Sequence, residues 1–236
     1  MDQLPAYLPA VFLLIVFATA FALAQAASFH RAVLTGIAAW LTLQFLLSLN
    51  GFYVRFQAVP PRMLLLVLPP LVLLVTLLAM KRGRRFLDRL DAGTLTLLHT
   101  VRLPVELVLW ALSLHRVIPT LLTFEGSNLD VLSGLTAPVL YYFTFVKSTI
   151  GRFGLLLWNI LCLGLLANVV YHAFLSAPTV LQRFAFDQPA VAIGYFPFTL
   201  LPGFVVPIVL LSHVAMIRRL LQREKTQEPT ALTVSP

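Results

Sequence analysis

Apolar stretches of about 20 residues recur along the whole chain, and they constrain the fold more than any other feature of the sequence. A stretch of this length can cross the hydrocarbon core of a bilayer as a helix, which satisfies its own backbone polar groups. The expected helices span residues 7–27, 32–49, 63–80, 94–114, 130–147, 153–174 and 195–217. The sequence therefore predicts an all-α, polytopic membrane bundle of about seven transmembrane helices. Residues 1–221 would form this single domain, and residues 222–236 a disordered polar tail.

Composition and charge agree with a membrane location. Hydrophobic residues make up 59% of the chain and charged residues only 11%, which is too apolar for a water-soluble core. The net charge of +8 arises from short basic clusters between the apolar stretches, where orientation in the membrane explains them. We therefore expect the lipid bilayer, and not nucleic acid, as the partner, with a multi-pass location in the cell membrane, or the inner membrane of a bacterium.

The first apolar stretch is expected to be a retained helix. It ends in Ala22-Leu23-Ala24, which resembles a signal-peptidase site. The basic segment that begins a signal peptide is missing, because Asp2 is the only charged residue before the stretch.

The distribution of Lys and Arg predicts the orientation, because short cytoplasmic loops collect these residues. With the N-terminus outside and the C-terminus inside, the inner segments hold twelve of the seventeen: Arg31, Lys81, Arg82, Arg84, Arg85, Arg89, Lys147, Arg152, Arg218, Arg219, Arg223 and Lys225. The outer segments hold Arg55, Arg62, Arg116 and Arg183. The fifth stretch is the weakest, since it is short and contains Pro138. If it were re-entrant, both chain ends would lie on the same side.

The stretch 94–114 carries the most informative polar residues. At about 100° per residue, its polar and aromatic side chains form one stripe within about 80° of the helix surface: His99, Arg102, Glu106, Trp110 and Ser113. Arg102 and Glu106 are one turn apart near mid-span, so they can pair with each other or across the bundle. Pro104, between them, favours a kink. Ionisable groups at this depth are costly and tend to face a cavity or a partner.

Two interpretations of the stripe follow. It lines a pocket or pathway, with Arg102 available to an anion and Glu106 to a proton or cation, or it is a buried ion pair that only joins helices. The last stretch contains Pro197, Pro202, Gly203 and Pro207 and cannot be regular throughout, which favours a site near it. The candidate ligand-binding residues are His99, Arg102, Glu106, Trp110, Ser113, Asn159 and Pro202.

Polar residues outside the stripe have two possible roles as well. Between helices, Gln44, Ser48, Asn159, Asn168 and His172 could complete a cavity or form interhelical hydrogen bonds. In the segment 123–130, Asn128 or Asp130 could cap the fifth helix, or the segment could contact a ligand or cation.

Several other function classes are disfavoured by the residues. The single cysteine, Cys162, excludes an internal disulfide. A retinal protein needs a lysine in its last helix, a zinc hydrolase clustered histidines, and an intramembrane serine protease a Gly-x-Ser-Gly motif, and none of these is found. Two histidines at similar depth, His99 and His213, keep a single b-type haem open.

The sequence thus predicts a central polar cavity that binds a small solute, an ion or a lipid headgroup, with transport as one use. The alternative is a non-transporting assembly or partner subunit whose buried charges are structural, and a haem-binding membrane protein comes third. No catalytic residue, metal ligand set or cofactor is identified.

Overall fold

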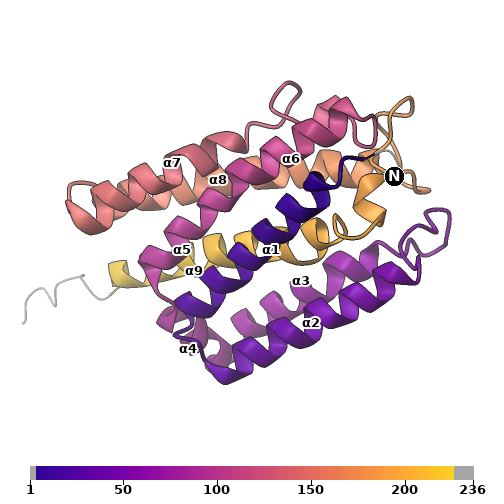
Figure 1. The fold of residues 1–236 in the computed structure, drawn as a ribbon. Helices are drawn as coiled ribbons and strands as arrows, with labels where there is room; N and C mark the ends of the chain where they lie inside the picture. Colours follow the sequence, from indigo (N-terminus) through magenta and orange to yellow (C-terminus); the bar gives the residue numbers. More distant parts are fainter. Residues whose placement is uncertain (1–3, 226–236) are drawn as a thin grey trace, which may run out of the picture.

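The computed structural model describes residues 4–225, in which the regular structure is entirely helical (Figure 1). The first helices are α1 (Tyr7–Ala26), α2 (Arg31–Leu49), α3 (Leu64–Ala79) and α4 (Lys81–Arg89). They are followed by α5 (Ala92–Leu98), α6 (Arg102–Leu114), α7 (Val131–Tyr141), α8 (Arg152–Ser176) and α9 (Val206–Lys225). A 3₁₀ turn, His99–Val101, joins α5 to α6, and a π-helical turn, Tyr142–Val146, extends α7.

Five helical segments are long and apolar enough to cross a membrane. They are α1, α2, the continuous stretch Ala92–Leu114, α8 and the segment Leu201–Gln222. α3 passes the same test only together with α4, and Val131–Val146 is shorter than a full span. Each of the seven apolar stretches expected to be helical contains a helix, but the count of seven crossings stays a prediction.

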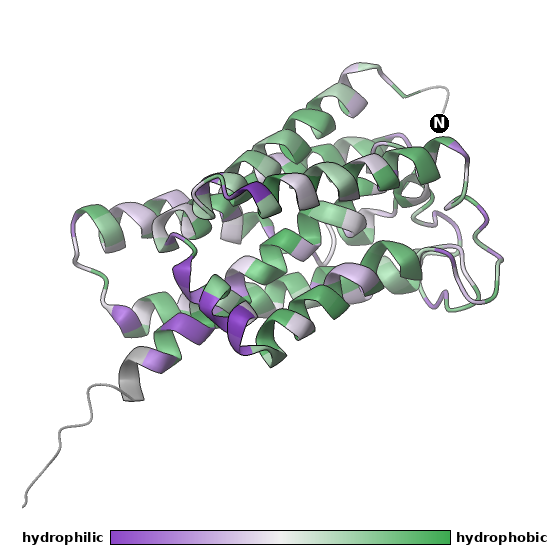
Figure 2. Cartoon of the chain, turned by 90° about the horizontal axis from the view of Figure 1, so that it is seen from below, coloured by the Kyte–Doolittle hydropathy of each residue, from purple (hydrophilic) through white to green (hydrophobic). Residues whose placement is uncertain are grey.

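The outer surfaces of the bundle expose many large apolar side chains, which is compatible with a lipid environment. Phe17 of α1, Val75 of α3 and Phe153 of α8 are 70%, 64% and 77% exposed. α2 buries only Gln44 and Ser48. Hydrophilic residues gather instead at the end of the bundle that carries α4 and the last turns of α9 (Figure 2). The apolar helix surfaces between the two ends therefore fit a bilayer.

The basic stretch after α3 forms a helix, which sequence patterning treated as a loop. α4 is bent by 99° from α3. Gly83 makes the sharp corner possible, because a Cβ there would collide with the backbone of Leu77. Arg84 Nη1 donates hydrogen bonds to the carbonyls of Leu78 (2.9 Å) and Ala79 (2.7 Å). These carbonyls lie at the end of α3, where the helix itself supplies no donor.

α5 begins at a side-chain cap. Asp91 Oδ1 accepts hydrogen bonds from the backbone N–H (2.7 Å) and the hydroxyl (2.6 Å) of Thr94. These two bonds hold the pKa of Asp91 below its usual value, and the bond from the Thr94 hydroxyl has the larger effect. The backbone N–H of Asp91 donates to the carbonyl of Ala26 (2.9 Å), which joins the start of α5 to the end of α1.

The last helix is irregular where its prolines lie, as the sequence predicts. Residues 195–199, expected to begin it, form a bend and turns, a π-helical turn spans Leu201–Val205, and regular α9 starts at Val206. The correction to the predicted start at residue 195 follows from Pro197, because a proline disfavours helical backbone angles at the residue before it, here Phe196. Trp40 Nε1 of α2 donates to the carbonyl of Gly203 (2.7 Å), which gives this irregular backbone a partner.

Helix packing places α1, α5, α6 and α9 at the centre. α1 contacts α5 and α6, and α5 also contacts α9. The pair α2 and α3 and the pair α7 and α8 lie on opposite sides of this group, and α1 begins at the end of the bundle opposite to the end of α9 (Figure 1). The Ala92–Leu114 span therefore runs through the interior, where its polar stripe meets the neighbouring helices.

Cysteine labelling tests whether α3 and α7 cross the membrane. The native Cys162 is buried, and its replacement removes the one cysteine of the chain. In a Cys162→Ala background, we expect Gln57→Cys and Arg116→Cys to react with an impermeant maleimide added from outside. Arg85→Cys and Ser148→Cys should react only from inside, because α3 and α7 separate them from the first two positions. All four positions are on connections or exposed helix surface. Labelling of Arg116→Cys and Ser148→Cys from the same side would show that α7 does not cross.

Candidate functional site

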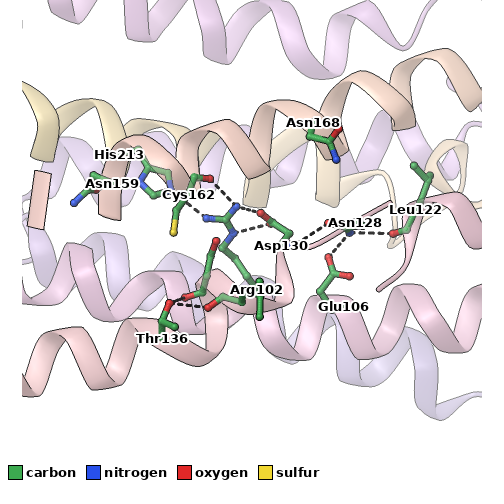
Figure 3. A network of polar contacts seen from close by, with 12 residues as sticks. Arg102, Glu106, Leu122, Asn128, Asp130, Thr136, Asn159, Cys162, Asn168 and His213 are labelled. Carbon is green, nitrogen blue, oxygen red and sulfur yellow. Dashed lines mark hydrogen bonds and ion pairs between the residues drawn. The ribbon is translucent and has the colours of Figure 1, made fainter. Parts of the chain in front are cut away.

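Arg102 and Asp130 form a buried ion pair at the centre of the bundle (Figure 3). Arg102 is the first residue of α6, and Asp130 directly precedes α7. Arg102 Nε donates to Asp130 Oδ2 at 2.6 Å, and Nη2 donates to Oδ1. The side chains are 3% and 7% exposed. Arg102 is about 15 Å along the helix from Ala92 and about 18 Å from Leu114, so the pair lies near mid-span.

The remaining donors of Arg102 also have partners inside the protein. Nη1 lies 3.1 Å from His213 Nε2, and Nη2 is 3.2 Å from the carbonyl of Cys162. A guanidinium only donates, so His213 Nε2 is the acceptor and its proton resides on Nδ1. That Nδ1 donates to Asn159 Oδ1 (3.0 Å), and Asn159 Nδ2 donates to the carbonyl of Leu155 (2.8 Å). Every side-chain nitrogen of Arg102 therefore has a partner on α8, on α9 or at Asp130, directly before α7.

Two histidines stack beside this network. The rings of His99 and His213 have centroids 3.9 Å apart at an interplanar angle of 25°. Ser212 Oγ donates to the carbonyl of Leu95 (2.9 Å) and lies 3.2 Å from His99 Nε2. The Nε2 atoms of both histidines therefore have partners in the protein, and haem binding would require both contacts to break. Haem ligation by this pair stays a prediction.

Glu106 is held on one side only. Asn128 Nδ2 donates to Glu106 Oε1 (2.5 Å) and to the carbonyl of Leu122 (3.0 Å). Asn128 Oδ1 accepts from the backbone N–H of Asp130 (3.0 Å). The segment before α7 is therefore bonded to α6 twice, through Asn128 to Glu106 and through Asp130 to Arg102. Glu106 is 2% exposed, yet its Oε2 has no hydrogen-bond partner in residues 4–225.

A cavity of about 170 Å³ borders Glu106. It lies among the start of α3, α6, α8 and the irregular beginning of the last helix, and Glu106 and Asp130 are the ionisable residues on its wall. The other lining residues are almost all apolar, such as Leu66, Leu109, Leu166 and Pro202. Phe174 on the wall is 39% exposed, so one side of the cavity reaches the outer surface of the bundle.

The predicted site residues separate into three groups. His99, Arg102 and Asn159 share the polar network, and Glu106 and Pro202 line the cavity. Trp110 and Ser113 lie further along α6, where the Trp110 ring is 6.0 Å from that of Phe124 and Ser113 Oγ donates to the Trp110 carbonyl (2.8 Å). The stripe therefore does not line one continuous pocket.

The expected pairing of Arg102 with Glu106 is corrected. Within residues 4–225 neither a hydrogen bond nor an ion pair joins them, because the 128–130 segment supplies a partner to each. Asp130 stands at the N-cap position of α7, but its carboxylate binds Arg102 and makes no capping bond. The sequence showed that the segment before the fifth apolar stretch is polar. It did not show that this segment enters the bundle as far as Arg102 at mid-span.

Within residues 4–225, Gln44 and Ser48 of α2 and Asn168 of α8 form side-chain hydrogen bonds with the connections between helices and not with other helices. Tyr53 Oη donates to Gln44 Oε1 (2.7 Å), and Ser48 Oγ is 2.9 Å from Thr199 Oγ1. Asn168 Nδ2 donates to the carbonyl of Ser127 (2.8 Å), which is a further attachment for the 115–130 connection. Outside the spans, burial raises the pKa of Tyr53.

Comparison with known proteins identifies a family without a known activity. Residues 59–221 match a family described as Domain of unknown function (DUF8737), which is more than half of the chain. The chain belongs to this family. The DUF8737 segment runs from the start of α3 into α9 and contains Arg102, Glu106, Asp130 and His213, whereas α1 and α2 precede it. No curated protein and no solved structure matches the chain.

We expect the Arg102–Asp130 pair to be the most sensitive to single substitutions, because removing one partner leaves a buried uncompensated charge. Arg102→Ala or Asp130→Ala should lower the free energy of unfolding by about 3–5 kcal/mol, measured in detergent. The double change Arg102→Met with Asp130→Leu should recover most of the loss.

A second ion pair provides a matched control. Arg218 Nε binds Asp88 Oδ1 at 3.0 Å, with side chains 21% and 32% exposed. Arg218→Ala or Asp88→Ala should cost about 0–1 kcal/mol. Equal effects at the two pairs would show that Arg102 and Asp130 are not shielded from water.

Proposed function

We propose that this DUF8737 protein is a seven-span membrane protein, with its N-terminus outside and its C-terminus inside, that binds a small amphipathic molecule beside Glu106. The apolar part of the ligand fills the cavity between α3, α6 and α8. A hydrogen-bond donor or positive charge on the ligand contacts Glu106 Oε2.

Two observations support the topology. α1 begins at the end of the bundle opposite to the end of α9, as an odd number of crossings requires (Figure 1). The segments at the α4 end hold twelve Lys and Arg residues of the described chain: Arg31, Lys81, Arg82, Arg84, Arg85, Arg89, Lys147, Arg152, Arg218, Arg219, Arg223 and Lys225. The segments at the other end hold four, Arg55, Arg62, Arg116 and Arg183, so the α4 end is the expected cytoplasmic side.

The observation that carries the binding proposal is the unpartnered Glu106 Oε2 on the wall of an apolar cavity. A buried acceptor without a donor costs about 1–3 kcal/mol, and more when it is charged. A ligand that brings a donor would offset this cost. The opposite end of the same carboxyl group is fixed by Asn128, so the free oxygen is held in place.

The size and walls of the cavity limit the ligand. A cavity of about 150 Å³ lined by apolar side chains holds a molecule the size of benzene, whereas drug-sized ligands need roughly 300–1,000 Å³. The enclosed part of the ligand is therefore about one ring or a short alkyl group. Any longer portion would extend past Phe174 toward the lipid.

The sequence left two roles open for Arg102, the binding of an anion and the joining of helices, and its contacts favour the second. Its contacts with Asp130, His213 and Cys162 leave it unavailable to an anion, which favours the structural alternative for this residue. The non-transporting assembly subunit is accordingly the second candidate function. In that case the Arg102 network would have the same structural role, and no ligand would bind at Glu106.

Transport is proposed as an extension of binding. The wall of the cavity includes Leu201 and Pro202 of the π-helical turn, whose backbone does not follow a regular hydrogen-bond ladder. Irregular helices at membrane depth are common where transporters bind their substrates. Movement of this wall would open the cavity to the end of the bundle at which α3 begins.

Three ring compounds of nearly equal size test the chemistry of the cavity. We expect benzylamine and benzyl alcohol to raise the melting temperature of the purified protein, and benzoate not to, because Glu106 favours a donor and repels an anion. At a ligand concentration of about 100 times Kd, the shift should be about 5–10 °C for a chain of this size. Glu106→Gln should remove the preference for the amine.

Glu125→Gln is the matched control, because Glu125 is exposed on the connection before α7. This variant should keep the wild-type response to all three compounds. Equal shifts with benzoate and benzylamine would indicate unspecific partitioning. No shift with any compound, or an unchanged amine preference in Glu106→Gln, would overturn the binding proposal.

A further inference from the structure

The position of α4 sets it apart from the spanning helices. α3 ends at Ala79, and after a 99° bend α4 runs across the end of the bundle (Figure 1). If α3 runs roughly along the bilayer normal, α4 lies nearly parallel to the membrane surface. Its connection to the apolar α3 by a single residue places it at the depth of the lipid headgroups.

The two faces of α4 have different chemistry. Gly83 and Leu87 are buried against the bundle. The exposed residues on the other face are all cations, Lys81, Arg82, Arg85 and Arg89. At about 100° per residue these four positions fall within about 100° of the helix surface, and they extend for about 12 Å along its axis. They form one continuous basic face, which is named the α4 basic face below.

The α4 basic face is not neutralised by the protein. Asp88, the one acidic residue of α4, is bound by Arg218 of α9 through Nε at 3.0 Å and Nη2 at 3.2 Å. Arg84 is directed to the carbonyls of α3. Within the part of the chain that the structure describes, no carboxylate pairs with any of the four exposed cations.

We propose that the α4 basic face binds the phosphate groups of anionic phospholipids in the adjacent leaflet. The guanidinium group matches a phosphate through paired N–H donors, and three of the four cations are arginines. An orientation signal needs only the number of charges in a loop. Here the charges are collected on one side of a surface helix whose other side is fixed by packing, so they face the headgroups together. This site is separate from the Glu106 cavity.

Retention of lipids from mixed nanodiscs tests the proposal. The full chain is reconstituted in phosphatidylcholine with phosphatidylglycerol, and retained lipids are counted by native mass spectrometry. We expect a preference for phosphatidylglycerol in the wild type. In the variant Lys81→Gln, Arg82→Gln, Arg85→Gln and Arg89→Gln the preference should fall at least tenfold, because each basic residue near an anionic surface contributes a factor of about five.

The opposite end of the bundle supplies a control with the same change of charge. The variant Arg55→Gln, Arg62→Gln, Arg116→Gln and Arg183→Gln should keep the preference within about twofold of the wild type. An equal loss in both variants, or a wild type with no preference, would overturn the proposal. Displacement of the lipid by inorganic phosphate at constant ionic strength would also overturn it, since the site would then take the free anion.

Two further measurements guard against misfolding of the glutamine variant. A variant with Arg82→Lys, Arg85→Lys and Arg89→Lys keeps every charge and should retain most of the preference. The wild-type preference should fall when salt is raised from about 0.05 M to about 1 M, because screening shortens the reach of exposed charges. A wild-type preference insensitive to salt would contradict binding through the α4 basic face.

Discussion

The ion pair between Arg102 and Asp130 is the interaction on which the central arrangement depends. A charge at mid-span costs about 2.5–3.5 kcal/mol even on mild insertion scales, so each residue requires the other. Asp130 belongs to the connection before α7, and the pair therefore brings this connection into the bundle. Asn128, two residues before Asp130, donates a hydrogen bond to Glu106, and the carbonyl of Ser127 accepts one from Asn168 of α8. His213 and the Cys162 carbonyl complete the shell of Arg102 and thereby join α8 and α9 to α6.

Arg102 and Glu106 are both buried ionisable residues of α6, but their hydrogen bonding differs. Arg102 has partners on each side, and its replacement together with Asp130 by apolar residues of similar size is expected to preserve the fold. Glu106 has one hydrogen-bonded and one unpartnered oxygen, and the residue lines a cavity whose walls are mostly apolar. A purely structural carboxyl group would gain from a second donor. The contrast between a saturated arginine and a half-satisfied glutamate four residues later locates the candidate site.

The helical spans were predictable because the apolar stretches have bilayer length, and their predicted bounds agree with α1, α2, α3 and α8 to within about two residues. The disruption before α9 followed from its prolines. α4 was missed because it is short and strongly basic, and because its corner depends on the contact of Gly83 with the backbone of Leu77. The partner of Arg102 was missed for another reason. Helical periodicity relates residues on one helix, whereas Asp130 and His213 reach Arg102 across 28 and 111 positions of the chain.

The start of α7 beside Arg102 leaves the two halves of the bundle unlike each other. In the half that contains α4, every segment crossing it is helical, and helices fill space regularly. In the other half the chain between residues 115 and 130 passes as an irregular connection where a further turn of helix would otherwise stand. The cavity lies on this side and includes Leu122 of that connection in its wall. The half that contains the cavity is therefore less regular in backbone structure than the half that contains α4.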